Sequence, residues 1–181
     1  MNDVQRSAVL SEDGLYRYRL DRSWGGGPRV AFTMLNPSTA DAREDDPTIR
    51  RCIGFARAWG YDGLTVVNLY PFRATSPAVM EMWLDGPASD DDSLALNTVA
   101  LLQAAQESAL MVAAWGVHGA RDGEAARTFL SNHITRWHHL GLTKDGHPRH
   151  PLYVKGDTKP IPWPAIGPTS DGGMNATGGS R

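Results

Sequence analysis

The sequence is poor in the features that mark several classes of protein. It has one cysteine, Cys52, and a single thiol cannot form an internal disulfide or a cysteine-only zinc site. No segment approaches the roughly 20 apolar residues that a membrane-spanning helix requires, so we expect no membrane partner. The formal net charge is only −2, which excludes a bulk electrostatic preference for nucleic acid or an anionic membrane.

The chain has 181 residues, enough for one compact domain with a sizeable core. Its first residues, MNDVQRSAVLSEDG, lack an apolar stretch behind a basic start, so we expect no secretory signal and a cytoplasmic protein. The segment 164–181 is rich in Gly, Ser, Thr and Pro and offers little to bury. The sequence therefore predicts a single domain over 1–163, followed by a disordered tail over 164–181.

Short apolar runs alternate with helix signals along the chain. Buried strands are predicted at 29–35, 63–70 and 109–116, an edge strand at 15–20 and a short strand at 138–142. Helices are predicted from Pro47 to just before Gly60, and at 77–84, 89–106 and 123–134. Alternating strands and helices imply parallel crossovers, with helices on both faces of the sheet. We therefore predict an α/β protein with three α/β/α layers and a mostly parallel central sheet.

Polar side chains follow each of the three most apolar strands. They are Asn36 and Ser38, Asn68 and Arg73, and His118 and Arg121. Because the carboxyl ends of parallel strands share one edge of an open sheet, ligands bind in the crevice there. The segment HPRHPLY, residues 147–153, follows the last short strand and can close the same cleft. The sequence therefore predicts a ligand site at this edge.

An unusually acidic connector follows the strand at 29–35. It contains Asp41, Glu44, Asp45 and Asp46, and we expect Asp46 to cap the helix that Pro47 opens. Such a run can also hold a divalent ion, which leaves a metal-dependent phosphohydrolase as an alternative function. His147 and His150 lack a clear third ligand, so no zinc site is expected.

Several motifs together resemble an uncharacterised bacterial and phage family, known as domain of unknown function 1643. They are MLNPSTAD, DDPTIRRCIGFARAWGYDGLTVVNLYPFRAT, AAWGVHGAR and LGLTKDGHPRHPLY. The resemblance covers roughly residues 15–163. It implies no particular activity.

The order of four shorter motifs is also similar to the uracil-DNA glycosylase superfamily. LNPST, VVNLYPFRAT, AAWGVHGA and RHPLY match that family's water-positioning turn, base-reading strand end, third strand end and histidine loop. Three features depart from the family pattern, and one of them is the acidic stretch 41–46, which has no counterpart there. FTML stands where the family has a glycine-rich lead, and RHPLY lacks the serine that contacts DNA phosphate.

A glycosylase-like chemistry would give roles to the matching positions and to residues near them. Asn36 or Asp41 would orient the attacking water, and His150 would donate a hydrogen bond to the leaving base, which makes these three the expected catalytic residues. The expected substrate contacts are Pro37, Ser38, Asn68, Tyr70, Phe72, Arg73, His118 and Tyr153. The expected contacts to a nucleic-acid backbone are Arg50, Arg51, Lys144 and Arg149.

The resulting hypothesis is a nucleobase-processing hydrolase of N-glycosidic bonds, with a uracil-DNA-glycosylase-like fold. Its ligand would be a base in DNA or a nucleotide, and it would need no cofactor and no metal. Besides the phosphohydrolase, a non-catalytic protein that binds a nucleotide or modified base remains an alternative.

Overall fold

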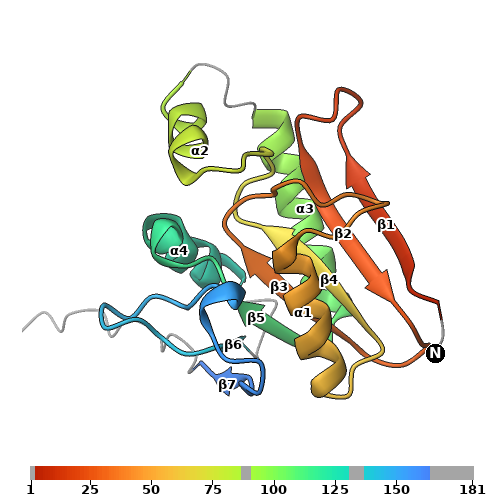
Figure 1. The fold of residues 1–181 in the computed structure, drawn as a ribbon. Helices are drawn as coiled ribbons and strands as arrows, with labels where there is room; N and C mark the ends of the chain where they lie inside the picture. Colours follow the sequence, from red (N-terminus) through yellow and green to blue (C-terminus); the bar gives the residue numbers. More distant parts are fainter. Residues whose placement is uncertain (1–2, 87–90, 131–136, 164–181) are drawn as a thin grey trace, which may run out of the picture.

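The computed structural model describes residues 3–86, 91–130 and 137–163. In these ranges one mixed sheet of seven strands has the order β1-β2-β4-β3-β5-β6-β7 (Figure 1). The strands are β1 (Gln5–Leu10), β2 (Arg17–Ser23), β3 (Arg29–Met34), β4 (Gly63–Asn68), β5 (Leu110–Ala113), β6 (Trp137–His139) and β7 (Ile161–Pro162).

The middle of the sheet is parallel and its flanks are antiparallel. β3 pairs in parallel with both β4 and β5, and β5 pairs in parallel with β6. The pairs β1–β2, β2–β4 and β6–β7 are antiparallel. The predicted α/β class is confirmed, but the sheet as a whole is more mixed than the sequence indicated.

The strand predicted at the edge lies inside the sheet. β2 is flanked by β4 and by β1, and most of its side chains are buried. β1 was not predicted, because only half of QRSAVL is apolar and most of its side chains are exposed. The prediction of an edge strand at 15–20 was therefore wrong, since β1 pairs with the outer side of β2.

Helices cover both faces of the sheet (Figure 1). They are α1 (Pro47–Ala58), α2 (Pro77–Leu84), α3 (Asp91–Glu107) and α4 (Ala120–Leu130), with 3₁₀ turns η1 (Val117–Gly119) and η2 (Pro151–Tyr153). Successive β3 residues point to opposite faces. Phe32 belongs to the hydrophobic cluster that contains Phe55 of α1, whereas Ala31 belongs to the cluster that contains Leu101 of α3.

Helix α1 begins and ends as the sequence predicts. The side chain of Asp46 accepts a hydrogen bond from the backbone N–H of Ile49 at 2.8 Å, and Pro47 occupies the first helical position. Gly60 has φ +84° just beyond the helix, a conformation that L side chains rarely adopt and that commonly ends helices. The start of α1 is therefore fixed at the edge where β3 ends.

Some predictions lie at or beyond the limits of the described residues. The helix predicted at 123–134 begins earlier, at Ala120, and is described to Leu130. The tail over 164–181 and the first residues of the helix predicted at 89–106 lie outside the described residues. Within the described ranges, no helix is both long and apolar enough to cross a membrane.

Candidate functional site

A cavity of about 760 Å³ lies where the segments after β3 and β5 meet. Its wall combines residues 34–36, 38 and 39, the start of α1 at 46–49, residues 74 and 75 after β4, the turn at 115–118, parts of 143–153, and Arg17 at the beginning of β2. This volume is within the range of cavities that hold small organic ligands. The position matches the edge at which parallel sheets bind ligands.

Six of the predicted site residues line this cavity. They are Asn36, Ser38, His118, Arg149, His150 and Tyr153. The backbone N–H of Gly116 donates to the carbonyl of Pro148 at 3.0 Å, which joins the turn after β5 to the HPRHPLY segment. The structure thus brings all four polar segments to this cavity, although the segment after β4 contributes Ala74 and Thr75 instead of Asn68 or Arg73.

Asn36 is held in a defined orientation. Its Nδ2 donates to the carbonyl of Ala74 at 2.8 Å and to that of Pro37 at 3.1 Å. Both contacts require a donor, so they identify the nitrogen of the amide and leave Oδ1 as an acceptor. A fixed acceptor in a cavity wall can orient a water molecule.

His150 caps the turn η2 and is held as a neutral ring. Its Nδ1 accepts from the backbone N–H of Leu152 at 3.4 Å, so the proton of the neutral imidazole lies on Nε2. Burial lowers the pKa of His150 below its ordinary value, and the negative charge of Asp46 opposes this shift in part. Near pH 7 the ring can therefore donate one hydrogen bond from Nε2.

Arg17 is a charged residue in the cavity wall that sequence reasoning missed. The residue is only 2% exposed, yet it lines the cavity. Its Nη1 donates to the carbonyl of Ala40 at 2.7 Å and its Nη2 to Oδ1 of Asn68 at 3.3 Å, while Nε has no partner in the described part of the chain. Burial lowers the pKa of Arg17 to about 10, so the group remains a cation at neutral pH.

Asn68 does not line the cavity, contrary to the expected convergence of the strand ends. It is 1% exposed, and its link to the cavity is the hydrogen bond from Arg17. Its Nδ2 has no hydrogen-bond partner within the described structure. Asn68 therefore lies one layer behind the wall, with Arg17 as the group that reaches the cavity.

Four further predicted contacts support the wall from behind. Tyr70 is buried in the core beside α2 and α3, and Phe72 stacks on Trp83 with ring centroids 5.2 Å apart. Arg73 donates to the carbonyls of Gly14 and Ser38 at 3.1 and 3.4 Å. The carbonyl of Pro37 accepts from the N–H of Ala74 at 2.9 Å. None of the four lines the cavity.

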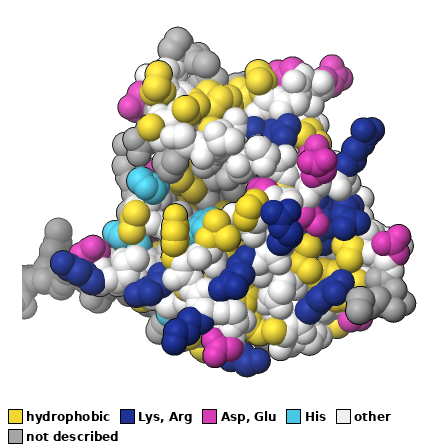
Figure 2. All heavy atoms as spheres, viewed as in Figure 1, with side chains coloured by type: hydrophobic (Ala, Val, Ile, Leu, Met, Phe, Trp, Pro, Cys, Tyr) yellow, Lys and Arg dark blue, Asp and Glu magenta, His cyan; other side chains and the backbone are white. Residues whose placement is uncertain are grey.

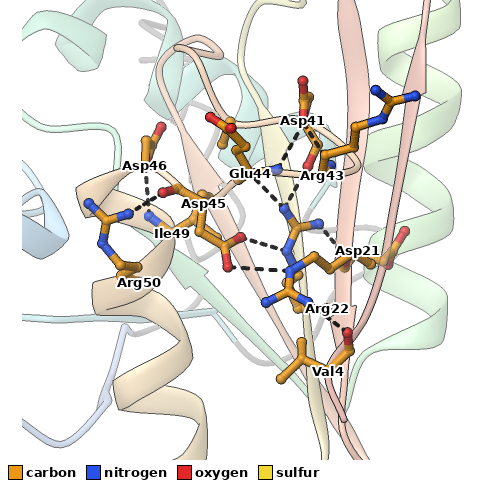
Figure 3. A network of polar contacts seen from close by, with 12 residues as sticks. Val4, Asp21, Arg22, Asp41, Arg43, Glu44, Asp45, Asp46, Ile49 and Arg50 are labelled. Atoms are coloured by element: carbon orange, nitrogen blue, oxygen red, sulfur yellow. Dashed lines mark hydrogen bonds and ion pairs between the residues drawn. The ribbon is translucent and has the colours of Figure 1, made fainter.

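The acidic connector is organised by hydrogen bonds to its own chain and to β2 (Figure 3). Oδ1 of Asp41 accepts from the N–H groups of Arg43 and Glu44 at 2.7 and 3.0 Å, and these bonds lower the pKa of Asp41. Asp45 accepts from Nε of Arg22 at 2.7 Å. The carboxylates thus shape the turn, which explains its acidity.

Only Asp46 of these carboxylates lines the cavity, and Asp41 does not. The sequence predicted the capping role of Asp46 correctly but did not assign it to the site. Among the described residues, no group of three or more His, Cys, Asp or Glu side chains could hold a metal ion. The geometry therefore gives the phosphohydrolase alternative no cluster of ligands.

The predicted backbone contacts differ in accessibility. Arg51 is half-buried, donates to the carbonyl of Val154 and lies over the ring of Phe55 at 5.3 Å. Arg50 is exposed and donates to the carbonyl of Asp45. Lys144 and Arg149 are also exposed. Figure 2 shows Lys and Arg side chains spread over the face that carries α1, with acidic side chains among them.

Comparison with known proteins places the chain in a family and gives it no activity. No curated protein and no solved structure matches it. The family described as Protein of unknown function (DUF1643) matches residues 17–152, which run from β2 into η2 and include nearly all of the cavity wall. The resemblance expected from the motifs is confirmed for this family, and the chain belongs to it.

Proposed function

We propose that the protein binds a nucleobase-containing ligand in this cavity and hydrolyses its N-glycosidic bond. The observation that carries the proposal is that Asn36 and His150 line one cavity. Asn36 contributes an oriented acceptor, Oδ1, and His150 contributes a donor, Nε2–H. The reaction needs both: an acceptor that holds water and a donor for the charge that develops on the departing base.

The reaction balances with these groups and one water molecule. Water attacks the anomeric carbon of the sugar while the carbon–nitrogen bond breaks and its electron pair leaves with the base. Oδ1 of Asn36 orients the water, and the Asp46 carboxylate, which lines the same cavity, accepts its proton. Nε2–H of His150 stabilises the negative charge on the base, which is released after protonation. In this proposal Asp46 takes the place of Asp41.

The order of the motifs supports the same chemistry by resemblance. LNPST, AAWGVHGA and RHPLY all contribute residues to the cavity wall, and they follow the order found in uracil-DNA glycosylases. A glycosylase-like three-layer architecture is part of this proposal. The fourth motif, VVNLYPFRAT, contributes Ala74 and Thr75 to the wall. Its Asn68 holds Arg17 and would not read a base edge directly.

The test is to measure release of free base by chromatography. The full chain is incubated with nucleosides, nucleoside monophosphates and uracil-containing single-stranded DNA, with and without Mg²⁺. We expect metal-independent release from at least one substrate. Replacing His150→Gln or Asn36→Ala should lower kcat by about 10² to 10⁴-fold, while Arg57→Gln, an exposed change on the outer side of α1, should not.

Two results would overturn the proposal in different ways. Binding of nucleotides without any release of base would identify a non-catalytic binding protein. Release of inorganic phosphate that requires Mg²⁺ would identify a phosphohydrolase.

A further inference from the structure

The guanidinium of Arg17 is a buried cation without a counterion in contact. Its two hydrogen-bond acceptors, the carbonyl of Ala40 and Oδ1 of Asn68, are both neutral, and no carboxylate in the described ranges lies within ion-pair distance. Burying an unpaired charge is expensive. By contrast Arg22, the other fully buried arginine of β2, pairs with Asp45 at 2.7 Å.

The surroundings of Arg17 fix its position and offset its charge only in part: burial lowers the pKa of Arg17, and the carboxylates of Asp46 and Asp41 oppose this shift from a distance. Asn68, which accepts from Nη2 of Arg17, is itself anchored in the interior: Nδ2 of Asn97, on α3, donates to the backbone carbonyls of Asn68 and Leu69 at 3.0 and 3.1 Å. Nε of Arg17 is buried and has no hydrogen-bond partner among the residues that the structure describes. The fold thus holds a cation with unused donor capacity in the wall of a cavity.

A second feature favours negative charge in the same place. The first turn of α1, from Pro47 to Ile49, lines the cavity, and the N-terminus of a helix carries a partial positive charge. Asp46 offsets part of this charge, because it caps the Ile49 N–H. A ligand that brings an oxyanion to Arg17 supplies the charge-assisted hydrogen bonds that the neutral acceptors cannot.

We infer that Arg17 binds an oxyanion of the ligand, a phosphate or a carboxylate, and that Asn68 positions Arg17 for this contact. The inference deepens the proposed function and rests on it for the nucleobase part. It specifies the ligand as a free nucleotide or a similar acidic nucleoside derivative that enters with its anionic end toward Arg17. A base turned out of DNA would instead leave its phosphates outside the cavity.

The substitution Asn68→Asp separates this role from simple structural support. Oδ1 of Asn68 already accepts from Arg17, and within the described ranges Nδ2 makes no hydrogen bond that the change would remove. The new carboxylate has the same shape and gives Arg17 an internal counterion. We therefore expect the variant to fold and to lose affinity for anionic ligands. Gln103→Glu is the matched control, since it makes the same amide-to-carboxylate change on the exposed side of α3.

The readout is calorimetric titration of the full chain with pyrimidine and purine C-nucleosides, which have no N-glycosidic bond to hydrolyse. Each is compared with its 5′-monophosphate and its 5′-carboxylate, and ribose 5-phosphate is added as a ligand without a base. We expect at least one anionic form to bind wild type about 10- to 100-fold more tightly than its neutral nucleoside. Asn68→Asp should abolish that difference, and Gln103→Glu should keep it.

The outcomes separate this inference from the proposed function. Neutral nucleosides that bind as tightly as both anionic forms would overturn the inference and leave the proposed function standing. A further outcome is that ribose 5-phosphate binds wild type as tightly as the nucleotides do and loses this affinity in Asn68→Asp. That result would support the oxyanion site and overturn the proposal that the ligand contains a nucleobase. If Asn68→Asp binds anions as wild type does, Arg17 is not the anion contact.

Discussion

Nε of Arg22 donates to Oδ1 of Asp45 across 2.7 Å, and it does so from a side chain with no solvent exposure. Arg22 belongs to β2, whereas Asp45 belongs to the acidic connector that leads into α1. The same guanidinium donates to the carbonyl of Asp41 at 2.6 Å (Figure 3). One buried arginine therefore fastens the connector, and with it Asp46 and the start of α1, to the sheet.

Replacing Asp45→Ala should destabilise the protein strongly. The change leaves the buried charge of Arg22 without its carboxylate, and breaking a buried ion pair in this way costs about 3–5 kcal/mol. Urea denaturation measures the loss in the free energy of unfolding. Asp41→Ala is the comparison, because it removes only acceptors for two backbone N–H groups and should cost about 1 kcal/mol. Equal losses in the two variants would contradict the anchoring role of Asp45.

Trp115, in the cavity wall, rests on two glycines of the segment that follows it. A Cβ atom at Gly123 would lie 2.3 Å from the Trp115 indole, and one at Gly119 would lie 2.6 Å from it. Gly123→Ala must therefore displace the indole or the helix, and overpacking of this kind costs about 1–3 kcal/mol. Thermal denaturation and ligand affinity should both worsen.

The control for this change is Gly54→Ala. Gly54 is an exposed helical residue of α1, and a Cβ atom there meets nothing within 4 Å. Alanine should stabilise that helix by roughly 0.5–1 kcal/mol. If Gly123→Ala is as well tolerated as Gly54→Ala, Trp115 does not depend on the close approach of α4.

Stability should decrease on acidification below about pH 6.5. Burial lowers the pKa of His139, aided by the charges of His138 and Arg127, and burial also lowers the pKa of His150. The folded state then binds fewer protons than the unfolded state, so the contribution of these histidines is present above the unfolded pKa. It is lost as pH falls through the lower folded pKa.

Denaturation curves between pH 8 and 5 check this dependence. The double variant His139→Gln/His150→Gln should show a flatter dependence of unfolding free energy on pH than wild type. An unchanged slope would show that other groups cause the acid sensitivity.

Local signals were sufficient for the parts of the fold that depend on neighbours in sequence. Asp46-Pro47 and Gly60 predicted the bounds of α1 because capping and left-handed glycine are short-range effects. β1 has no such signal, since only half of QRSAVL is apolar and the strand forms because β2 offers a partner. Because β1 was not predicted, β2 was predicted to lie at the edge of the sheet.

The candidate site was predictable only in its outline. The convergence of Asn36, His118 and His150 follows from where parallel strands end. The burial of Asn68 correctly implied a partner for its amide, but that partner is Arg17, 51 residues away. In an alternating strand Arg17 looks like a solvent-facing residue, and only the pairing of β2 inside the sheet makes it part of the cavity.

The central claim is that Arg17 binds the oxyanion of a ligand whose sugar and base lie between Asn36 and His150. A crystal structure with a C-nucleoside 5′-monophosphate bound tests this claim most directly. We expect phosphate oxygens within about 3 Å of the Arg17 guanidinium, and the sugar and base between Asn36 and His150. A ligand bound outside the cavity, or an empty cavity at a ligand concentration that saturates the protein in solution, would contradict this claim.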